Sequence, residues 1–149
     1  MAGAEGTESP RRNLDRSLGD GGMPLLAELG LSFDGYGDGW SAAAWVPTDV
    51  ACNPAGIVQG GVYGVIHDAA MNFAVNSALE RGDRAATLDV QYQTRRAATA
   101  GDALRVRGEV TQITRQIAYV ESVVQSADDR VVSQATATFA LRRREGDPT

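Results

Sequence analysis

The hydrophobic positions of the chain follow two different periods. Within residues 60–79, apolar side chains recur at the three- and four-residue spacing of an amphipathic α-helix. They occupy positions 62, 65, 66, 69, 70 and 73, and the small Ser77 continues the same stripe. Within residues 87–141, apolar and polar side chains alternate and β-branched residues are enriched, which predicts four β-strands. The turns between these strands are short, so we expect the strands to pair as an antiparallel meander.

The N-terminal part of the chain predicts one helix and one strand. Residues 23–31 have a proline in the first turn and Gly30 near the end, as short helices often do. Residues 41–46 follow a glycine-rich bend and are predicted to form a strand, with a loop between that strand and the long helix. The architecture expected is therefore α+β, with an antiparallel five-stranded sheet packed against one long helix.

Both ends of the chain lack a periodic apolar pattern. Residues 1–22 are rich in glycine and charged residues, which predicts a disordered N-terminal tail. Residues 144–149 are predicted to be a polar C-terminal tail. A single domain is therefore expected over residues 23–143.

The long helix carries one charge that its pattern does not explain. Asp68 is the only formal charge in residues 60–79, and at about 100° per residue it lies opposite the apolar stripe. Its neighbours on that side are small or apolar: Gly64, Met71, Val75 and Leu79. We infer that this second face is covered as well. A symmetric copy of the chain is the simplest cover, so at least a homodimer is expected.

Composition narrows the class of protein. The net charge is −5 and no basic run occurs, so nucleic acid is not an expected partner. One cysteine and one histidine allow neither an internal disulfide nor a zinc site of the usual composition. No apolar run approaches the roughly 20 residues that span a bilayer, and no secretory signal is apparent. We expect a cytoplasmic protein with no membrane segment, no metal and no cofactor.

The start of the helix offers a place for a ligand oxygen. Gly60 and Gly61 lie where backbone N–H groups are unpaired and the helix dipole is positive, although a tight turn would also explain them. Asn53 can donate to the same oxygen or brace the loop. Asp68 is about 12 Å further along the helix, whereas reacting groups must approach to about 3–3.5 Å. Two antiparallel helices across a twofold axis would bring each Asp68 to the other chain's Gly60. The alternative for Asp68 is a structural tether to backbone N–H groups.

The pattern Asn53-x-x-Gly56-x-x-Gln59-Gly60-Gly61-x6-Asp68, followed by a long helix and four strands, resembles the hotdog-fold acyl-CoA thioesterases of the PaaI-like type. The resemblance covers residues 23–143 and includes residues 96–102, which are similar to the turn before a strand of that family. It implies a hotdog fold, in which the sheet wraps around the long helix. It also implies an acyl-CoA substrate and a homodimer, or a homotetramer built from two dimers.

The resemblance implies a role for each motif residue. The Gly60 N–H would be the oxyanion donor, and Asp68 would act across the dimer interface as nucleophile or general base. Asn53 would help to polarise or position the thioester carbonyl, and Thr87 would orient the water. The family usually has histidine where this chain has Gln59. Glutamine can donate a hydrogen bond but cannot transfer a proton near neutral pH, so the histidine's role does not carry over. Alternatively, Gln59 merely caps the helix.

Three further residues are candidates for substrate binding: Gly61, Tyr63 and Arg96. Tyr63 could line an acyl channel together with Trp40 and Met71, although each of these side chains could equally belong to the core. Arg96 and its neighbour Arg95 could meet CoA phosphates, or they could be solvated cations at a strand end.

The expected activity is hydrolysis of an acyl- or aryl-CoA thioester to the free acid and CoA. Two other functions stay open. A non-catalytic acyl-CoA-binding protein is favoured only by Gln59. An enoyl-thioester hydratase or dehydratase would need an Asp–His pair presented from a loop-to-helix segment. His67 lies inside the helix and points about 100° away from Asp68, so the two side chains do not face each other.

Overall fold

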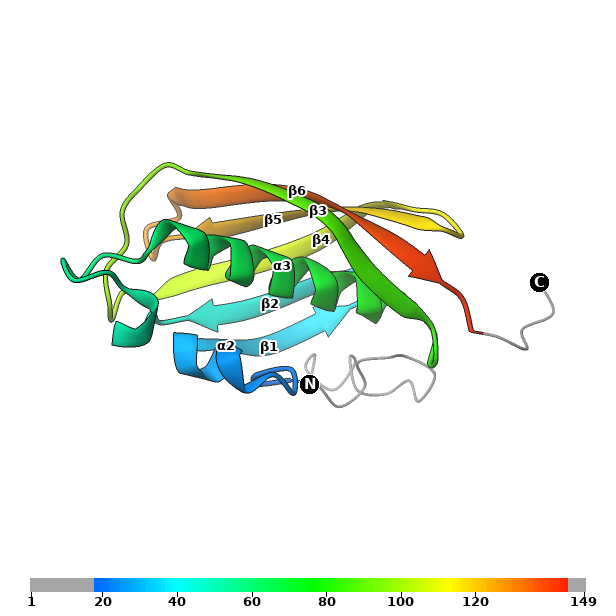
Figure 1. Cartoon of the computed structure of the whole chain (residues 1–149), viewed down its shortest axis with the longest axis horizontal. Helices are drawn as coiled ribbons and strands as arrows, with labels where there is room; N and C mark the ends of the chain where they lie inside the picture. Colours follow the sequence, from blue (N-terminus) through cyan, green and yellow to red (C-terminus); the bar gives the residue numbers. More distant parts are fainter. Residues whose placement is uncertain (1–17, 145–149) are drawn as a thin grey trace.

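A curved antiparallel sheet wraps around one long helix (Figure 1). The computed structural model describes residues 18–144. Within this range the sheet has six strands in the order β1-β2-β4-β5-β6-β3. The helical elements are α2 (Pro24–Leu29), the short 3-10 helix η1 (Asp49–Ala51) and α3 (Gly60–Ser77). The strands are β1 (Leu31–Gly37), β2 (Trp40–Trp45), β3 (Arg84–Thr94), β4 (Leu104–Ile113), β5 (Ile117–Gln125) and β6 (Val131–Arg142).

The prediction of five strands was one strand short. β1 was missed because its sequence contains two glycines and an aspartate, and a bulge between Phe33 and Gly35 interrupts its alternation. Its inward residues, Leu31, Phe33 and Tyr36, are nevertheless buried. Gly19, which falls in the segment predicted to be a tail, exchanges backbone hydrogen bonds with Phe33. The remainder of the predicted tails, residues 1–17 and 145–149, lies outside the described residues.

The strand pairing confirms only part of the predicted meander. β4, β5 and β6 follow one another as antiparallel neighbours through short turns. β3 pairs with β6 instead of β4, and β4 pairs on its other side with β2. The residues after β3 are therefore not a hairpin turn but a connection, residues 95–103, that crosses from one edge of the sheet to its middle. β3 is left at an edge of the described sheet.

The curvature of the sheet covers two faces of α3. On one face, Tyr63, Ile66, Ala70 and Phe73 belong to a core cluster formed with β1, β2 and β4. On the next face, Met71, Val75 and Leu79 pack with β5 and β6, and none of the three is exposed. The inference that a second copy of the chain covers these three side chains was therefore wrong. A flat sheet would leave them in solvent, whereas this sheet bends around them.

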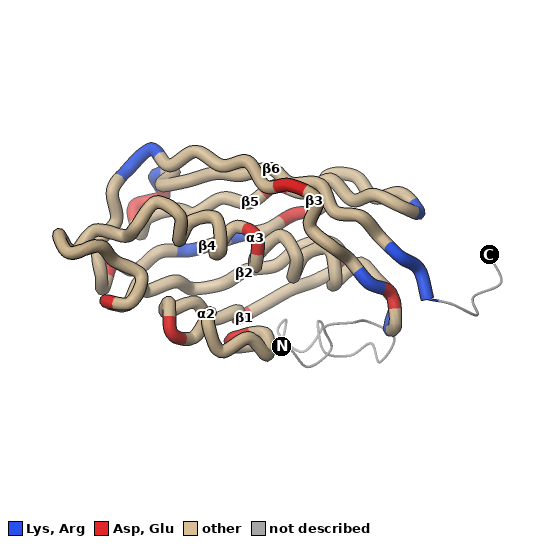
Figure 2. Tube along the Cα trace, in the orientation of Figure 1, with Lys and Arg blue, Asp and Glu red and all other residues tan. Residues whose placement is uncertain are grey.

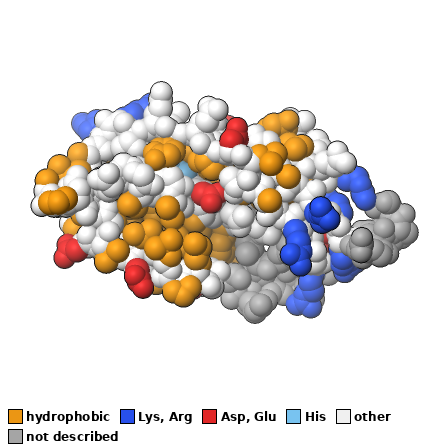
Figure 3. All heavy atoms as spheres, viewed as in Figure 1, with side chains coloured by type: hydrophobic (Ala, Val, Ile, Leu, Met, Phe, Trp, Pro, Cys, Tyr) orange, Lys and Arg blue, Asp and Glu red, His pale blue; other side chains and the backbone are white. Residues whose placement is uncertain are grey.

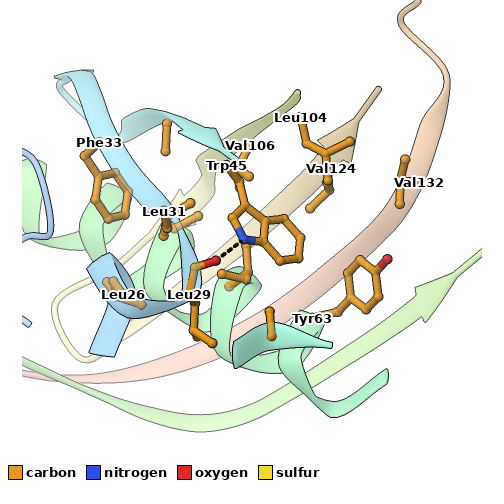
Figure 4. Packing of buried hydrophobic residues seen from close by; sticks show 14 of the residues in the cluster. Leu26, Leu29, Leu31, Phe33, Trp45, Tyr63, Leu104, Val106, Val124 and Val132 are labelled. Carbon is orange, nitrogen blue, oxygen red and sulfur yellow. Dashed lines mark hydrogen bonds between the residues drawn. The ribbon is translucent and has the colours of Figure 1, made fainter. Parts of the chain in front are cut away.

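One side-chain hydrogen bond fixes α2 against the sheet, and another fixes α3. Figure 4 shows the first cluster, in which the Trp45 indole N–H donates a 2.9 Å hydrogen bond to the carbonyl of Leu29. Closer to the middle of α3, the Ser41 hydroxyl donates to the Ala70 carbonyl at 2.8 Å. A Cβ at Gly108 would lie 2.4 Å from that same carbonyl oxygen, so only glycine allows this approach. In residues 18–144, no helix is both long and apolar enough to cross a membrane.

Candidate active site

Asp68 and Thr87 meet between the helix and the edge strand. The Thr87 hydroxyl donates a 2.8 Å hydrogen bond to Oδ1 of Asp68. Asp68 is half-buried on the side of α3 that the sheet leaves partly open. It is the single acidic position on α3 in Figure 2. The helix and the strand thus hold a carboxylate and a hydroxyl together at the surface of one subunit.

A β-bulge explains why Thr87 points at the helix. The register of β3 against β6 shifts between Thr87 and Asp89. Strict alternation would place Thr87 on the opposite face from Val90, whereas the extra residue turns both side chains toward α3. Beside the bulge, the Asp89 carboxylate accepts a 3.2 Å hydrogen bond from the N–H of Thr138, its partner on β6.

The start of α3 is open. Gln59 is the N-cap residue, but its side chain makes no capping hydrogen bond, so the interpretation of Gln59 as a simple helix cap was wrong. The first N–H groups of a helix have no partner inside the helix. A Cβ built at Gly60 or Gly61 meets no atom within 4 Å. Neither glycine is therefore required by packing within the subunit, and both leave room above the unpaired N–H groups.

Asn53 organises the loop that leads into this helix. Its side-chain oxygen accepts hydrogen bonds from the N–H groups of Ala55 at 3.0 Å and Ile57 at 3.2 Å. The loop is held further by a bond from the Val58 N–H to the Ala98 carbonyl at 2.9 Å. Because the amide is planar, these two contacts turn its NH2 group away from the loop, where it can donate to a ligand.

Tyr92 is a site residue that the sequence did not reveal. Its hydroxyl donates to the Gly60 carbonyl at 3.0 Å, and its ring would lie 3.0 Å from a Cβ at Gly64. The alternation within residues 87–141 predicted a strand here, but no spacing rule connects Tyr92 with the start of α3. The lack of a side chain at Gly64 was the available signal, because an inner helix glycine often marks a close approach.

A pocket of about 290 Å³ adjoins the helix start. Its lining is Ile57, Val58, Gly60, Tyr63, Thr94, Arg95, Arg96 and Ala97. It thus brings together the predicted residues Gly60, Tyr63 and Arg96. Trp40 and Met71 are not among its lining: Arg107 lies over the Trp40 ring at 5.0 Å, and Met71 is in the second core cluster.

The Tyr63 side chain is buried beside this pocket. Its ring meets the edge of Trp45 with centroids 5.6 Å apart, and its hydroxyl has no hydrogen-bond partner within residues 18–144. Burial raises the pKa of Tyr63 above its ordinary value, and the negative charge on Asp102 adds to that effect. The hydroxyl is therefore a protonated donor at neutral pH.

His67 belongs to a buried polar network away from Asp68. Its Nδ1 lies 2.9 Å from the Ser122 hydroxyl and its Nε2 lies 2.8 Å from the Ser133 hydroxyl. Ser133 donates in turn to the carbonyl of Gln93 at 3.1 Å. Burial lowers the pKa of His67 to about 4, so the ring is neutral at neutral pH. An Asp–His pair of the kind used by hydratases is not formed.

The expected oxyanion donor, Gly60, and the expected nucleophile or base, Asp68, lie far apart within one subunit. Gly60 and Asp68 lie on the same uninterrupted helix, about 12 Å apart along its axis. Reacting groups must come within about 3.5 Å of one another. In residues 18–144 no group of three or more His, Cys, Asp and Glu side chains is placed to hold a metal ion.

Residues 55–133 match the sequence profile of the thioesterase superfamily. The chain belongs to this superfamily. It is a thioester hydrolase, and its fold is the hotdog fold of the PaaI-like thioesterases, as the motif resemblance implied. No sequence among the curated proteins matches this chain significantly.

Solved structures agree with this assignment. A putative thioesterase from Ralstonia eutropha, described as related to phenylacetic acid degradation, is 31% identical, covers 78% of this chain and 89% of its own, and superposes with a TM-score of 0.71. The Escherichia coli PaaI protein from the phenylacetic acid degradation operon has 18% identity, 80% and 84% coverage and a TM-score of 0.73. A hypothetical thioesterase from Streptococcus pneumoniae, solved with coenzyme A, has 20% identity, 76% and 87% coverage and a TM-score of 0.71.

Proposed function

We propose that this thioesterase hydrolyses acyl- or aryl-CoA thioesters in a homodimer whose active sites are shared between subunits. The observation that carries the proposal is the pairing of Asp68 with Thr87 at a surface, about 12 Å from the open helix start at Gly60. A second copy with its helix antiparallel places each Asp68 beside the other subunit's Gly60. The coenzyme A in the Streptococcus pneumoniae structure supports a CoA thioester as the substrate class.

The thioester carbonyl lies above the helix start in this proposal. The N–H of Gly60 donates to the carbonyl oxygen, whose negative charge grows as the carbon becomes tetrahedral. The Asn53 amide, which the loop turns outward, adds a second donor. Gly61 leaves the space that the substrate fills. Each well-placed donor to such an oxyanion is typically worth about 3–4 kcal/mol.

Asp68 of the partner subunit supplies the attack. Its carboxylate either bonds to the carbonyl carbon, giving an anhydride that water then hydrolyses to the free acid, or takes a proton from the water that attacks the carbon. The C–S bond then breaks, and the thiol leaves as a thiolate without needing an acid at position 59. The Thr87 hydroxyl donates to Oδ1 of Asp68, so its oxygen is left to accept a hydrogen bond from the attacking water.

Gln59 and the pocket complete the site. The exposed Gln59 side chain makes no capping bond and can donate to the substrate, although it cannot act as a general acid. The acyl group enters the pocket beside Tyr63, and Arg96 lies at its rim to meet a phosphate. The neutral, enclosed His67 disfavours the alternative of an enoyl-CoA hydratase.

The test is thiol release from a panel of acyl- and aryl-CoA thioesters by wild-type protein and the Asp68→Asn variant. Loss of the carboxylate is expected to lower kcat by about a thousandfold. Asp34→Asn is the matched control, because Asp34 is an exposed carboxylate that pairs with Arg105 on another strand. Unchanged thiol release in Asp68→Asn would overturn the assignment, and consumption of an enoyl-CoA without thiol release would favour the hydratase.

Mixed dimers test the sharing of sites. Subunits carrying Asp68→Asn are combined with differently tagged subunits carrying Gly60→Val, and the heterodimer is isolated. A shared arrangement leaves one site with both halves intact, so about half of the wild-type activity returns. If each site were contained in one subunit, the heterodimer would stay as inactive as its parents.

A further inference from the structure

The arginines of this protein are divided between paired and unpaired positions. Among residues 18–144, ion pairs join Arg105, Arg107, Arg130 and Arg143 to carboxylates. Five exposed arginines make no ion pair with the described residues: Arg84, Arg142, Arg144, Arg95 and Arg96. All five lie near the two ends of the edge strand. Arg84 begins β3 opposite Arg142 of β6, and Arg95 and Arg96 follow its other end.

The two ends of β3 are therefore positive, and they are far apart within one subunit. Figure 2 shows basic positions in the connection after β3 and, at the opposite end of the sheet, where β3 begins and β6 ends. In Figure 3 basic side chains gather at that second end. The carboxylate of Asp83 is close by but is already engaged, by the Arg143 side chain at 3.4 Å and the Arg144 N–H at 2.8 Å.

The proposed dimer brings these two ends together. A twofold axis that exchanges Gly60 with Asp68 passes the helix at its midpoint, Gly64. Tyr92 touches Gly64, and Thr87 touches Asp68, so the same axis crosses β3 between those two strand residues. Arg84 and Arg96 are each six positions from Val90, which lies in that interval. The axis therefore places Arg84 of one subunit opposite Arg95 and Arg96 of the other.

This juxtaposition concentrates positive charge at the mouth of the pocket. Arg95 and Arg96 line the pocket that contains Gly60 and Tyr63. One carboxylate is in reach of Arg96: the pKa of Asp128 is lowered chiefly by the hydrogen bond from Ser126, and Arg130 and Arg96 add to this effect. The carboxylate of Asp128 also interacts with Arg130. Its one negative charge therefore does not neutralise the positive charges of Arg84, Arg95 and Arg96 in the proposed dimer. Their mutual repulsion is relieved when a polyanion lies between them.

We propose that Arg84 of the partner subunit, with Arg142 beside it, joins Arg95 and Arg96 to bind the phosphate groups of the CoA substrate. This inference rests on the proposed function. It makes the nucleotide subsite a shared one, like the reacting centre. Each subunit then gives Asp68 and Arg84 to one site, and Gly60, Arg95 and Arg96 to the other. Guanidinium groups suit this ligand because they bind phosphate oxygens in a bidentate manner.

The first experiment separates phosphate recognition from catalysis. The same acyl group is presented as the CoA thioester and as the N-acetylcysteamine thioester, which lacks all phosphates. Arg84→Gln is expected to raise KM for the CoA thioester about tenfold, with kcat kept and the short thioester unaffected. Arg107→Gln, which removes the same charge from β4, is the control and is expected to change neither. An equal effect on both thioesters, or none on either, would overturn the assignment of Arg84.

The second experiment asks which subunit supplies Arg84. A heterodimer is isolated from one subunit with Asp68→Asn and another with Arg84→Gln. Its one intact carboxylate comes from the subunit that lacks Arg84, so a shared subsite predicts the raised KM of the Arg84→Gln homodimer. A wild-type KM would mean that Arg84 serves its own subunit's Gly60, and it would overturn the proposal.

Calorimetric titration of free CoA makes the inference independent of turnover. Arg84→Gln is expected to weaken CoA binding about tenfold and to reduce its dependence on salt, whereas Arg107→Gln leaves both unchanged. If the wild-type protein hydrolyses no thioester, the proposed function fails, and the titration still decides whether Arg84 binds CoA. If hydrolysis and CoA binding both persist unchanged in Arg84→Gln, only the role of Arg84 fails.

Discussion

The hydroxyl of Thr87 on β3 donates a 2.8 Å hydrogen bond to the carboxylate of Asp68 on α3. This contact depends on the bulge after Thr87, which turns the side chain toward the helix. It engages one carboxylate oxygen, and no other donor among residues 18–144 binds the Asp68 side chain. A structural tether would be expected to satisfy the carboxylate with backbone N–H groups, and this hydroxyl contact is a different arrangement.

Thr87→Val replaces the hydroxyl with a methyl group of similar size. Because the water and the carboxylate lose a shared hydrogen-bonding group, kcat is expected to fall about ten- to a hundredfold while KM changes little. Steady-state thiol release measures both constants. Thr87→Ser keeps the hydroxyl and is expected to retain most of the activity. Equal losses in the valine and serine variants would contradict the role of the hydroxyl.

Gly60→Ala and Gly108→Ala add the same methyl group in two different surroundings. At Gly60 the methyl meets no atom of the subunit, so stability is unchanged but the space for the substrate is filled, and kcat/KM is expected to fall about a hundredfold. At Gly108 the methyl would lie 2.4 Å from the Ala70 carbonyl oxygen, and unfolding free energy is expected to drop by about 1–3 kcal/mol. Urea unfolding and thiol release on both variants check the contrast. Destabilisation of Gly60→Ala would show that its loss of activity is a folding defect.

Gln59→Ala tests a side chain that does not cap its helix. Stability is expected to change by less than about 0.5 kcal/mol, because no described hydrogen bond of the side chain is lost. If Gln59 contacts the substrate, kcat/KM falls about tenfold. Gln59→His introduces a group that titrates near pH 6.5, so the pH profile of kcat is expected to gain an ionisation that the wild-type protein lacks. Identical profiles for the two proteins would place position 59 outside the reaction.

The buried His67 makes stability depend on pH. Its pKa is lowered to about 4, below the ordinary value of 6.5, so the unfolded chain binds the proton more tightly. Stability is therefore complete above pH 6.5 and is lost as the pH falls from 6.5 toward 4. The loss due to this residue between pH 7 and pH 4.5 is about 2.5 kcal/mol.

Urea unfolding of wild-type protein and His67→Gln at the two pH values isolates this effect, since the carboxylates contribute equally to both proteins. The amide of glutamine can still bond the Ser122 and Ser133 hydroxyls but does not titrate. Between pH 7 and pH 4.5, the unfolding free energy of the wild-type protein is expected to fall by about 2.5 kcal/mol more than that of the variant. Equal losses would mean that His67 is protonated without cost in the folded protein.

The sequence predicted α3 and its start well, because helical periodicity and a Gly-Gly pair are local signals. It did not predict the pairing of β3 with β6, because strand order depends on the long connection after β3 and not on alternation. The periodic pattern did not predict how the sheet bends, which only the family resemblance implied, and so Met71 was assigned to a partner's cover when β5 and β6 bury it. Local sequence patterns predict which faces of the helix are apolar, whereas the curvature of the sheet determines which strands cover those faces.

The candidate site was predictable to different degrees at different residues. Asp68 stood out as a lone charge, and Gly60 as the opening of a helix. Thr87 came only from the resemblance to a family, since the bulge that turns it toward the helix cannot be read from strict alternation. Tyr92 had no such help, because a hydrogen bond between residues separated by 32 positions leaves no trace in spacing.

The contact between Tyr92 and α3 links the evolution of two distant positions. The Gly60 carbonyl that Tyr92 binds belongs to the same peptide group as the Gly61 N–H, so the bond polarises that N–H toward a ligand. A Cβ at position 64 would lie 3.0 Å from the Tyr92 ring, so even alanine there requires the ring to shift, and a larger side chain requires more. A lineage that gains a large residue at 64 is therefore expected to lose the tyrosine and its bond to the helix start. Relatives are expected to vary at these two positions together, with a larger residue at 64 accompanied by a smaller one at 92.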